Sequence, residues 1–113
     1  MPPQTAFFDP INYYRTVFHE LGHWTGHGSR LARDLANRHG SEGYAREELV
    51  AEIASAFLCA SQSITPTARH ADYIGAWLTA LRNDARAIFQ AASLASKAVD
   101  YILAIAVKEN AVA

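Results

Sequence analysis

The chain has 113 residues, of which half are hydrophobic, and its formal net charge is −1. This length fits one domain with a real core, or part of one. The nearly neutral charge argues against a domain that binds nucleic acid by itself, because such domains usually carry a marked basic excess. The single cysteine, Cys59, excludes an internal disulfide framework and indicates a reducing compartment.

The first predicted helix begins at Asp9 and Pro10, where an N-cap residue precedes a proline at the first helical position. It runs through INYYRTVFHELGHW and is expected to end near Gly26 and Gly28, because glycine favours helix ends. The polar stretch GSRLARDLANRHGSEG that follows predicts a loop with one helical turn at most.

The second predicted helix covers EGYAREELVAEIASAFLCA and has Ser41 as its N-cap. Its apolar residues recur at intervals of three and four, which predicts one buried face. These residues are Leu49, Ile53, Ala56, Phe57 and Ala60. For Cys59, on the same helix, we expect a small buried side chain.

Two further helices follow. Thr65-Pro66 repeats the cap-and-proline signal and opens a third helix through HADYIGAWLTAL. Asn83 or Asp84 caps a fourth, which we expect to run from residue 85 to about residue 107. No segment alternates with the period of two that marks a β-strand. The chain is therefore predicted to be mainly α, with about four helices around one core.

Neither end of the chain carries a recognisable targeting signal. MPPQTAFFDP lacks the basic and apolar regions of a signal peptide. The apolar segment AVDYILAIAV is shorter than a membrane span and has Asp100 and Lys108 nearby. We therefore expect a soluble cytoplasmic protein that makes no membrane contact.

The first predicted helix contains His19, Glu20 and His23 in an HExxH motif. Residues four apart lie one above the other on a helix, so both imidazoles can reach one zinc ion. Glu20 lies about 100° round the helix from His19, where it can touch a metal-bound water without binding the metal. That is the general-base position of zinc peptidases. HExxH also occurs in helices by chance, so a third ligand is needed to make the prediction specific.

A catalytic zinc ion needs three protein ligands and one open position. The second predicted helix offers Glu47, Glu48 and Glu52. Glu48 and Glu52 share a face at i and i+4, which suits one ligand and one carboxylate that holds the free N–H of a ligating histidine. We therefore assign Glu48 as the third ligand and Glu52 as the supporting carboxylate, with Glu47 as the rival ligand. The alternative for all three is a solvated acidic first turn favoured by the helix dipole.

A peptidase also needs a group that stabilises the developing oxyanion. The candidates are His70, Tyr73, Tyr44 and Arg69, and spacing does not choose among them. His27 does not fit the metzincin pattern HExxHxxGxxH, whose third histidine would fall on Ser29. We interpret it as a loop histidine.

Three segments carry a family resemblance: FHELGHWTGH…SRLARDL, GSEGYAREELVAEIASAFL and RHADYIGAWLTALRNDARAIFQAASLASKAVDYIL. They closely resemble the C-terminal metallopeptidase domain of ArdC-type antirestriction proteins, and related domains occur in plasmid primases and in polyvalent proteins of phages and conjugative elements. The resemblance covers nearly the whole chain. It implies a zincin-like, gluzincin-type fold in which His19, His23 and a glutamate of the EELVAE helix bind Zn²⁺, with Glu20 as the catalytic acid and base.

The resemblance also implies a biological setting. Such proteins enter a recipient cell with mobile DNA, such as a plasmid, and help it to escape restriction. Members typically carry an N-terminal domain that binds single-stranded DNA, and zincins place a sheet ahead of the HExxH helix. We expect neither of them within residues 1–113, which are predicted to be a single zincin-like domain in a fragmentary or reduced form, with the N-terminal sheet missing or reduced.

Two main hypotheses follow. The first is a zinc metallopeptidase domain of an antirestriction protein, which hydrolyses a peptide bond of a protein or peptide, such as a host defence protein, by zinc-activated water with Glu20 as general base. The alternative is a non-catalytic, zinc-stabilised module that binds protein or DNA and blocks restriction. A metal-free helical interaction domain is a third, simpler interpretation.

The remaining expectations concern partners. Arg30, Arg33 and Arg38 form a modest basic patch, although a solvated loop with Asp34 interleaved explains them as well. We expect DNA binding by this domain alone to be weak or absent. We expect apolar residues of the last helix, such as Ile102, Leu103 and Ile105, to meet a second copy in a homodimer or a missing N-terminal part.

Overall fold

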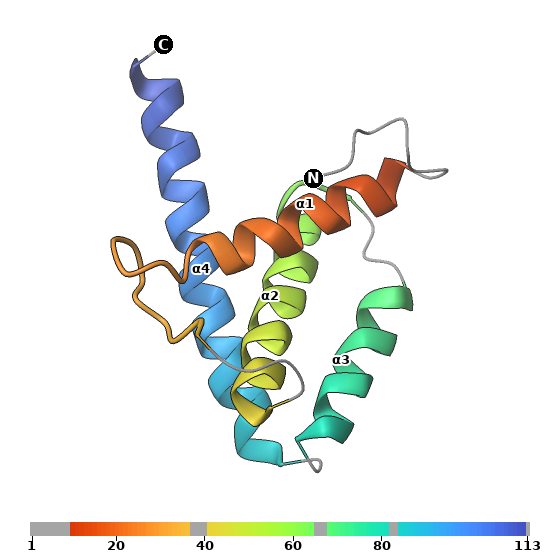
Figure 1. Ribbon diagram of the computed structural model, residues 1–113. Helices are drawn as coiled ribbons and strands as arrows, with labels where there is room; N and C mark the ends of the chain where they lie inside the picture. The colour runs from red at the N-terminus through yellow and green to blue at the C-terminus, as the bar shows by residue number, and fades with distance from the viewer. Residues whose placement is uncertain (1–9, 37–40, 65–67, 82–83, 113) are drawn as a thin grey trace.

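The computed structural model describes residues 10–36, 41–64, 68–81 and 84–112 (Figure 1). Within these ranges the chain forms α-helices and no β-strand. The helices are α1 (Pro10–Trp24), α2 (Glu42–Ser61), α3 (Ala68–Ala80) and α4 (Ala85–Val112). The predicted mainly α class with four helices is therefore confirmed.

The helix boundaries follow the capping signals of the sequence wherever these are described. Ser41 is the N-cap of α2, and its side-chain oxygen accepts a hydrogen bond from the Tyr44 amide at 3.2 Å. Asp84 caps α4, because its carboxylate accepts from the Arg86 amide at 3.0 Å. The other predicted signals, Asp9, Thr65-Pro66 and Asn83, lie outside the described residues. α4 extends beyond the predicted end because no glycine or proline interrupts it.

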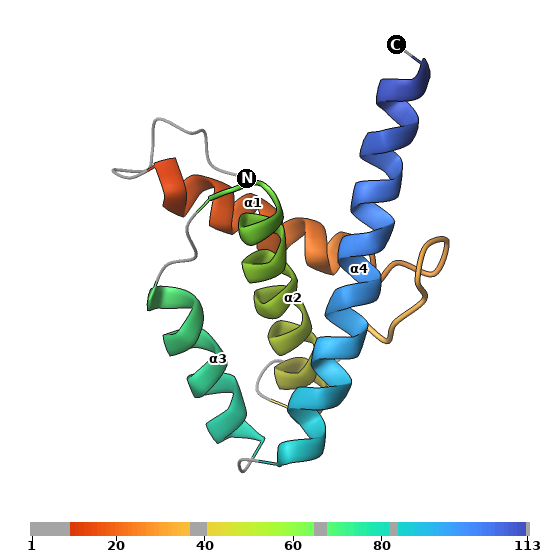
Figure 2. The same cartoon turned by 180° about the vertical axis from the view of Figure 1, so that it is seen from behind.

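α2 lies at the centre of the fold and packs against each of the other helices, with α3 and α4 on opposite sides of it (Figures 1 and 2). Its buried residues are Ala45, Leu49, Val50, Ala51, Glu52, Ile53, Ala54, Ser55, Leu58 and Cys59. They surround most of the helix because three neighbours cover it. The predicted single buried face is therefore wrong, since Phe57 is 42% exposed and Ala60 is exposed too. The predicted burial of Cys59 is confirmed.

α4 packs on α2 through small side chains. Ala87, Ala91, Ala95 and Ala98 recur at intervals of three and four and are all buried. Such a stripe lets two helices approach closely. Leu49 of α2 is fully buried in the same cluster, and truncating a core leucine to alanine typically costs about 2–5 kcal/mol. The far end of α4 extends past α1, away from the other helices (Figures 1 and 2).

α4 is also long and apolar. Its segment Ala85–Lys108 has 24 residues and reaches a mean hydropathy of 1.3, enough to cross a membrane by length and composition alone. It is longer than the apolar segment AVDYILAIAV on which the sequence prediction was based. In the fold, α4 buries its alanine stripe against α2, but only 22% of the apolar window within this segment is buried.

α1 crosses α2 where Gly22 meets Ala51. A Cβ atom placed on Gly22 would lie 3.0 Å from the Ala51 Cα, so only glycine allows the two helices to come this close. One turn away, the Ser55 hydroxyl donates a hydrogen bond to the Arg15 carbonyl at 2.8 Å. The crossing brings the HExxH residues of α1 over the glutamates of α2.

Candidate metal centre

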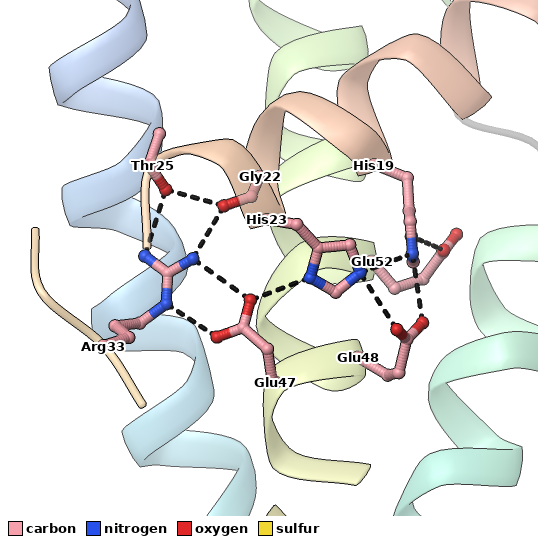
Figure 3. A network of polar contacts seen from close by, with 8 residues as sticks. All are labelled: His19, Gly22, His23, Thr25, Arg33, Glu47, Glu48 and Glu52. Carbon is pink, nitrogen blue, oxygen red and sulfur yellow. Dashed lines mark hydrogen bonds and ion pairs between the residues drawn. The ribbon is translucent and has the colours of Figure 1, made fainter. Parts of the chain in front are cut away.

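His19, His23 and Glu48 bring three potential metal-binding atoms together (Figure 3). The two Nε2 atoms are 3.1 Å apart. The Glu48 carboxylate lies 3.1 Å from Nε2 of His19 and 2.9 Å from Nε2 of His23. Ligand atoms about 2.0–2.1 Å from a tetrahedral zinc ion lie about 3.3 Å from one another. A small adjustment of these side chains is therefore enough to admit the ion.

The meeting of these side chains follows from helix geometry and close packing. His19 and His23 are one turn apart on α1. Gly22, between them, lets α1 lie directly on Ala51 of α2. Glu48 precedes Ala51 by about one turn, so its carboxylate rises toward the two imidazoles.

Glu52 supports His19 from its other ring nitrogen. Nδ1 of His19 lies 2.9 Å from the Glu52 carboxylate, which is only 1% exposed. Arg15 pairs with the same carboxylate at 3.3 Å. A carboxylate on Nδ1 fixes the neutral imidazole in the tautomer that leaves Nε2 without a proton. Nε2 of His19 is thus directed at Glu48 as a potential metal ligand.

Glu47 takes the corresponding place beside His23. Its carboxylate lies 2.8 Å from Nδ1 of His23. Arg33, from the loop after α1, donates to both oxygens of Glu47, at 2.8 and 3.2 Å. The structure thus separates the two glutamates that the sequence left as rivals, because Glu48 meets both Nε2 atoms whereas Glu47 faces Nδ1 (Figure 3).

The carboxylates control the protonation of the two histidines. Burial lowers the pKa of both, but hydrogen bonds outweigh it: Glu48 and Glu52 raise the pKa of His19, and Glu47 and Glu48 raise that of His23, each from 6.5 to about 9. Burial raises the pKa of Glu48, yet its hydrogen bonds with His19 and His23 lower it from 4.5 to about 2. A metal ion held by these residues at neutral pH would therefore displace protons.

Two pockets open beside the triad. One, of about 190 Å³, is lined by Arg15, Thr16, His19, Glu48, Glu52, Tyr73 and Trp77. The other, of about 260 Å³, is lined by His23, Leu35, Tyr44, Glu47 and Glu48. Glu48 lines both pockets, whereas His19 lines only the first of the two and His23 only the second.

Among the other predicted catalytic residues, two tyrosines line these pockets, Glu20 lines neither, and two side chains lie outside the described part of the chain. Glu20 follows His19 on α1, and its side chain is exposed. Tyr73 and Tyr44 line one pocket each. The charge of Glu48 raises the pKa of Tyr44, which keeps its phenol protonated as a hydrogen-bond donor. The side chains of the other two oxyanion candidates, His70 and Arg69, lie outside the described residues.

The sequence missed the roles of two arginines, Arg15 and Arg33. Arg33 is only 8% exposed and is ion-paired with Glu47, so it belongs neither to an exposed basic patch nor to a solvated loop. Arg30 lies 4.0 Å from the Trp24 ring and donates to its carbonyl at 2.6 Å. Arg38 lies outside the described residues. Nothing in the spacing signals the pairings of Arg15 and Arg33, because each partner lies on another element.

His27 is exposed in the loop after α1, with its Nδ1 2.9 Å from the Ser29 hydroxyl. The interpretation of His27 as a loop histidine is confirmed.

Comparison with known proteins shows what this chain is similar to. A family model described as a zincin-like metallopeptidase matches residues 1–94. A curated relative, the DNA primase TraC of Escherichia coli, is 51% identical over 110 residues, which are 96% of this chain and 10% of that protein. The chain thus spans about a tenth of the length of this primase.

Two solved structures are also similar. One is the Mn(II)-bound crystal structure of the antirestriction protein ArdC from plasmid R388, with 45% identity and a TM-score of 0.71. The match covers 91% of this chain and 39% of that one. The metal-free structure of the same protein gives a TM-score of 0.67.

Proposed function

This chain belongs to the zincin-like metallopeptidase family, and from that premise we propose that it is a zinc-dependent peptidase domain of an antirestriction protein. One observation carries the proposal, the convergence of His19 Nε2, His23 Nε2 and the Glu48 carboxylate at separations of 2.9–3.1 Å. Three protein donors leave one position of a four-coordinate ion open, which is what a catalytic zinc site requires.

The donor set favours zinc over other divalent ions. Two imidazoles and one carboxylate are common zinc ligands, whereas manganese prefers sites richer in oxygen. Both Nδ1 atoms already face carboxylates, Glu52 for His19 and Glu47 for His23, as in the carboxylate–histidine–zinc arrangement. The Mn(II)-bound form of the similar ArdC structure supports a divalent ion at this kind of site.

We assign Glu20 as the general base. It follows His19 on α1, so its exposed side chain leaves the helix about 100° away from the ligand. A zinc ion held by the triad would lower the pKa of a water molecule and polarise the peptide carbonyl. Glu20 takes a proton from the water that attacks the carbonyl carbon, and delivers it to the amine as the C–N bond breaks.

The proposed substrate is a protein or peptide. The two pockets on either side of Glu48 are suited to residues that flank a scissile bond. Tyr44 and Tyr73, one in each pocket, are the described candidates for a hydrogen bond to the oxyanion. In the setting of an antirestriction protein, a host defence protein in the cytoplasm is the proposed target.

The test is cleavage of an unfolded protein by the zinc-loaded domain and by its Glu20→Gln variant. Loss of a general base typically reduces the rate by about 10²–10⁴-fold. We expect a loss in this range, with zinc content unchanged by elemental analysis. Glu42→Gln is the matched control, because Glu42 is an exposed glutamate in the first turn of α2.

Cleavage that survives Glu20→Gln unchanged contradicts the assigned base. A wild-type domain that binds zinc stoichiometrically but cleaves neither unfolded nor folded proteins supports the alternative, a non-catalytic zinc-stabilised module. That module would not use Arg33 to hold DNA, because this guanidinium is buried against Glu47.

A further inference from the structure

Each histidine of the donor triad is backed by a carboxylate and an arginine. Glu52 contacts Nδ1 of His19 and pairs with Arg15. The spacing of Glu48 and Glu52 in the sequence predicted the role of this carboxylate. A second pair, Glu47 and Arg33, stands behind His23.

We propose that Glu47 and Arg33 form a positioning arm that orients His23 for metal binding, and that neither residue binds the metal. This inference rests on the proposed metal site and deepens it.

The guanidinium of Arg33 fixes both the ring of His23 and the helix that carries it. It donates to the two Glu47 oxygens at 2.8 and 3.2 Å, and Glu47 in turn meets Nδ1 of His23 at 2.8 Å. It also donates to the Gly22 carbonyl at 2.7 Å and to the hydroxyl of the fully buried Thr25 at 3.0 Å. Carbonyls in the last turn of a helix lack partners within the helix, so Arg33 also caps α1.

The backbone of the loop after α1 leaves room for the Arg33 side chain and directs it toward Glu47. A Cβ atom on Gly26 would lie 2.9 Å from a terminal nitrogen of Arg33 and 2.8 Å from Leu35, so glycine leaves the space that the guanidinium occupies. Ala32 has a φ of 54°, in the left-handed region that a residue other than glycine adopts at a cost of about 1–2 kcal/mol. Such strain persists only where the surrounding contacts hold the backbone in place. One such contact is the hydrogen bond that the Arg33 amide donates to the Gly26 carbonyl at 2.9 Å.

The same contacts argue against Glu47 as a metal ligand. Both of its oxygens are engaged by Arg33, and one of them also meets His23. To reach the ion, Glu47 would have to break a charge-assisted pair with an arginine that is only 8% exposed. Glu48 already lies between the two Nε2 atoms and needs no such exchange.

The experiment measures Co²⁺ binding by visible absorption in Arg33→Ala, Glu47→Ala and the double variant. Loss of a residue that orients a metal ligand typically lowers affinity by about 10–100-fold, and we expect this loss in each single variant. The double variant should lose no more Co²⁺ affinity than the single variant that binds less tightly, because the effects of two residues that act through one contact are not additive. At saturation the cobalt spectrum should remain that of the wild type, since the ligand set is unchanged.

Two further variants control for folding and for loop effects. Arg30→Ala is the matched control, because Arg30 lies in the same loop and also caps α1, at the Trp24 carbonyl, and we expect its cobalt affinity to be unchanged. Glu47→Gln keeps the size of the side chain but weakens its charge-assisted contacts. It tests the arm if Arg33→Ala does not fold, and its affinity should also fall.

The proposal is overturned if these variants bind Co²⁺ as tightly as the wild type, if the two single losses multiply in the double variant, or if saturated Glu47→Ala shows a changed cobalt spectrum. Glu48→Ala separates this result from the proposed function. If the wild type binds Co²⁺ and Glu48→Ala does not, the metal site stands whether or not the positioning arm does. If the wild type itself fails to bind, the metal site falls.

Discussion

Gly22 lies so close to Ala51 that a Cβ atom on the glycine would come 3.0 Å from the Ala51 Cα and 3.4 Å from its Cβ. This contact sets the distance between α1 and α2, and with it the distance from the two imidazoles to Glu48. The glycine inside the HExxH motif therefore has a structural role in the metal centre.

Gly22→Ala should destabilise the fold. Replacing a helical glycine gains about 0.5–1 kcal/mol of helix preference, but an extra methyl group in a packed interface costs about 1–3 kcal/mol. Because Ala51 belongs to a buried helix and cannot move aside, we expect a net loss of about 1 kcal/mol in urea unfolding. Gly75→Ala is the control. A Cβ atom there meets nothing within 4 Å, so this substitution should stabilise the fold. Equal stabilisation by both substitutions would contradict the role of this contact.

The stability of the metal-free protein should fall as the pH rises above neutrality. His19 and His23 have a pKa of about 9 in the fold and 6.5 without it, so their stabilising contribution is complete below pH 6.5 and is lost as the pH rises through 9. Glu48, with a pKa lowered from 4.5 to about 2, contributes fully above pH 4.5 and loses its contribution as the pH falls toward 2. With a chelator present, maximum thermal stability is therefore expected between about pH 4.5 and pH 6.5, where both contributions are complete.

The matched control is His27→Gln, which replaces an exposed histidine outside the triad, so the loss of stability between pH 6.5 and 9 should persist in this variant. A melting temperature of the chelated protein that stays level from pH 6.5 to 9 would show that the imidazoles are not held protonated by the glutamates.

Zinc should protect the domain from unfolding. A ligand at about 100 times its dissociation constant adds about 2.7 kcal/mol to the free energy of unfolding when it binds only the folded state. We expect this gain in the wild type, reversed by a chelator, and its loss in Glu48→Ala. Calorimetry with and without zinc measures it. Protection retained in Glu48→Ala would argue that another residue supplies the third ligand.

Arg15→Met should destabilise the fold through Glu52. The Glu52 carboxylate is 1% exposed, so removing its arginine leaves a charge buried without this partner. Breaking such a pair typically costs about 3–5 kcal/mol, and we expect about 3 kcal/mol because protonated His19 still contacts the carboxylate. Adding Glu52→Gln to Arg15→Met should recover part of the loss in urea unfolding. A further loss in the double variant would show that the carboxylate is not the source of the cost.

Local signals in the sequence were enough to predict the helices. Ser41 and Asp84 act as caps through hydrogen bonds to amides two or three residues away, so their effect does not depend on the rest of the fold. The burial of α2 was harder to predict, because it depends on how many helices surround it. Phe57 fits the apolar repeat and is nevertheless exposed.

The candidate site, too, could be predicted only in part. Helix pitch alone places His19 and His23 on one face, and the spacing of Glu48 and Glu52 on the next helix suggests which carboxylate meets which ring nitrogen. The place of Glu47 could not be predicted, because it is fixed by Arg33, and the position of Arg33 depends on the path of a loop.

Every group of the triad and of its two supporting pairs comes from α1, the following loop or α2, between Arg15 and Glu52. α3 lines one pocket and places the Tyr73 ring 4.9 Å from the Arg15 guanidinium, and α4 covers the far side of α2. The candidate metal centre is therefore built from two crossed helices, α1 and α2, that are consecutive in the sequence. A protein that receives these two helices has to cover the buried residues of α2 that α3 and α4 cover here, such as Leu49 and Leu58.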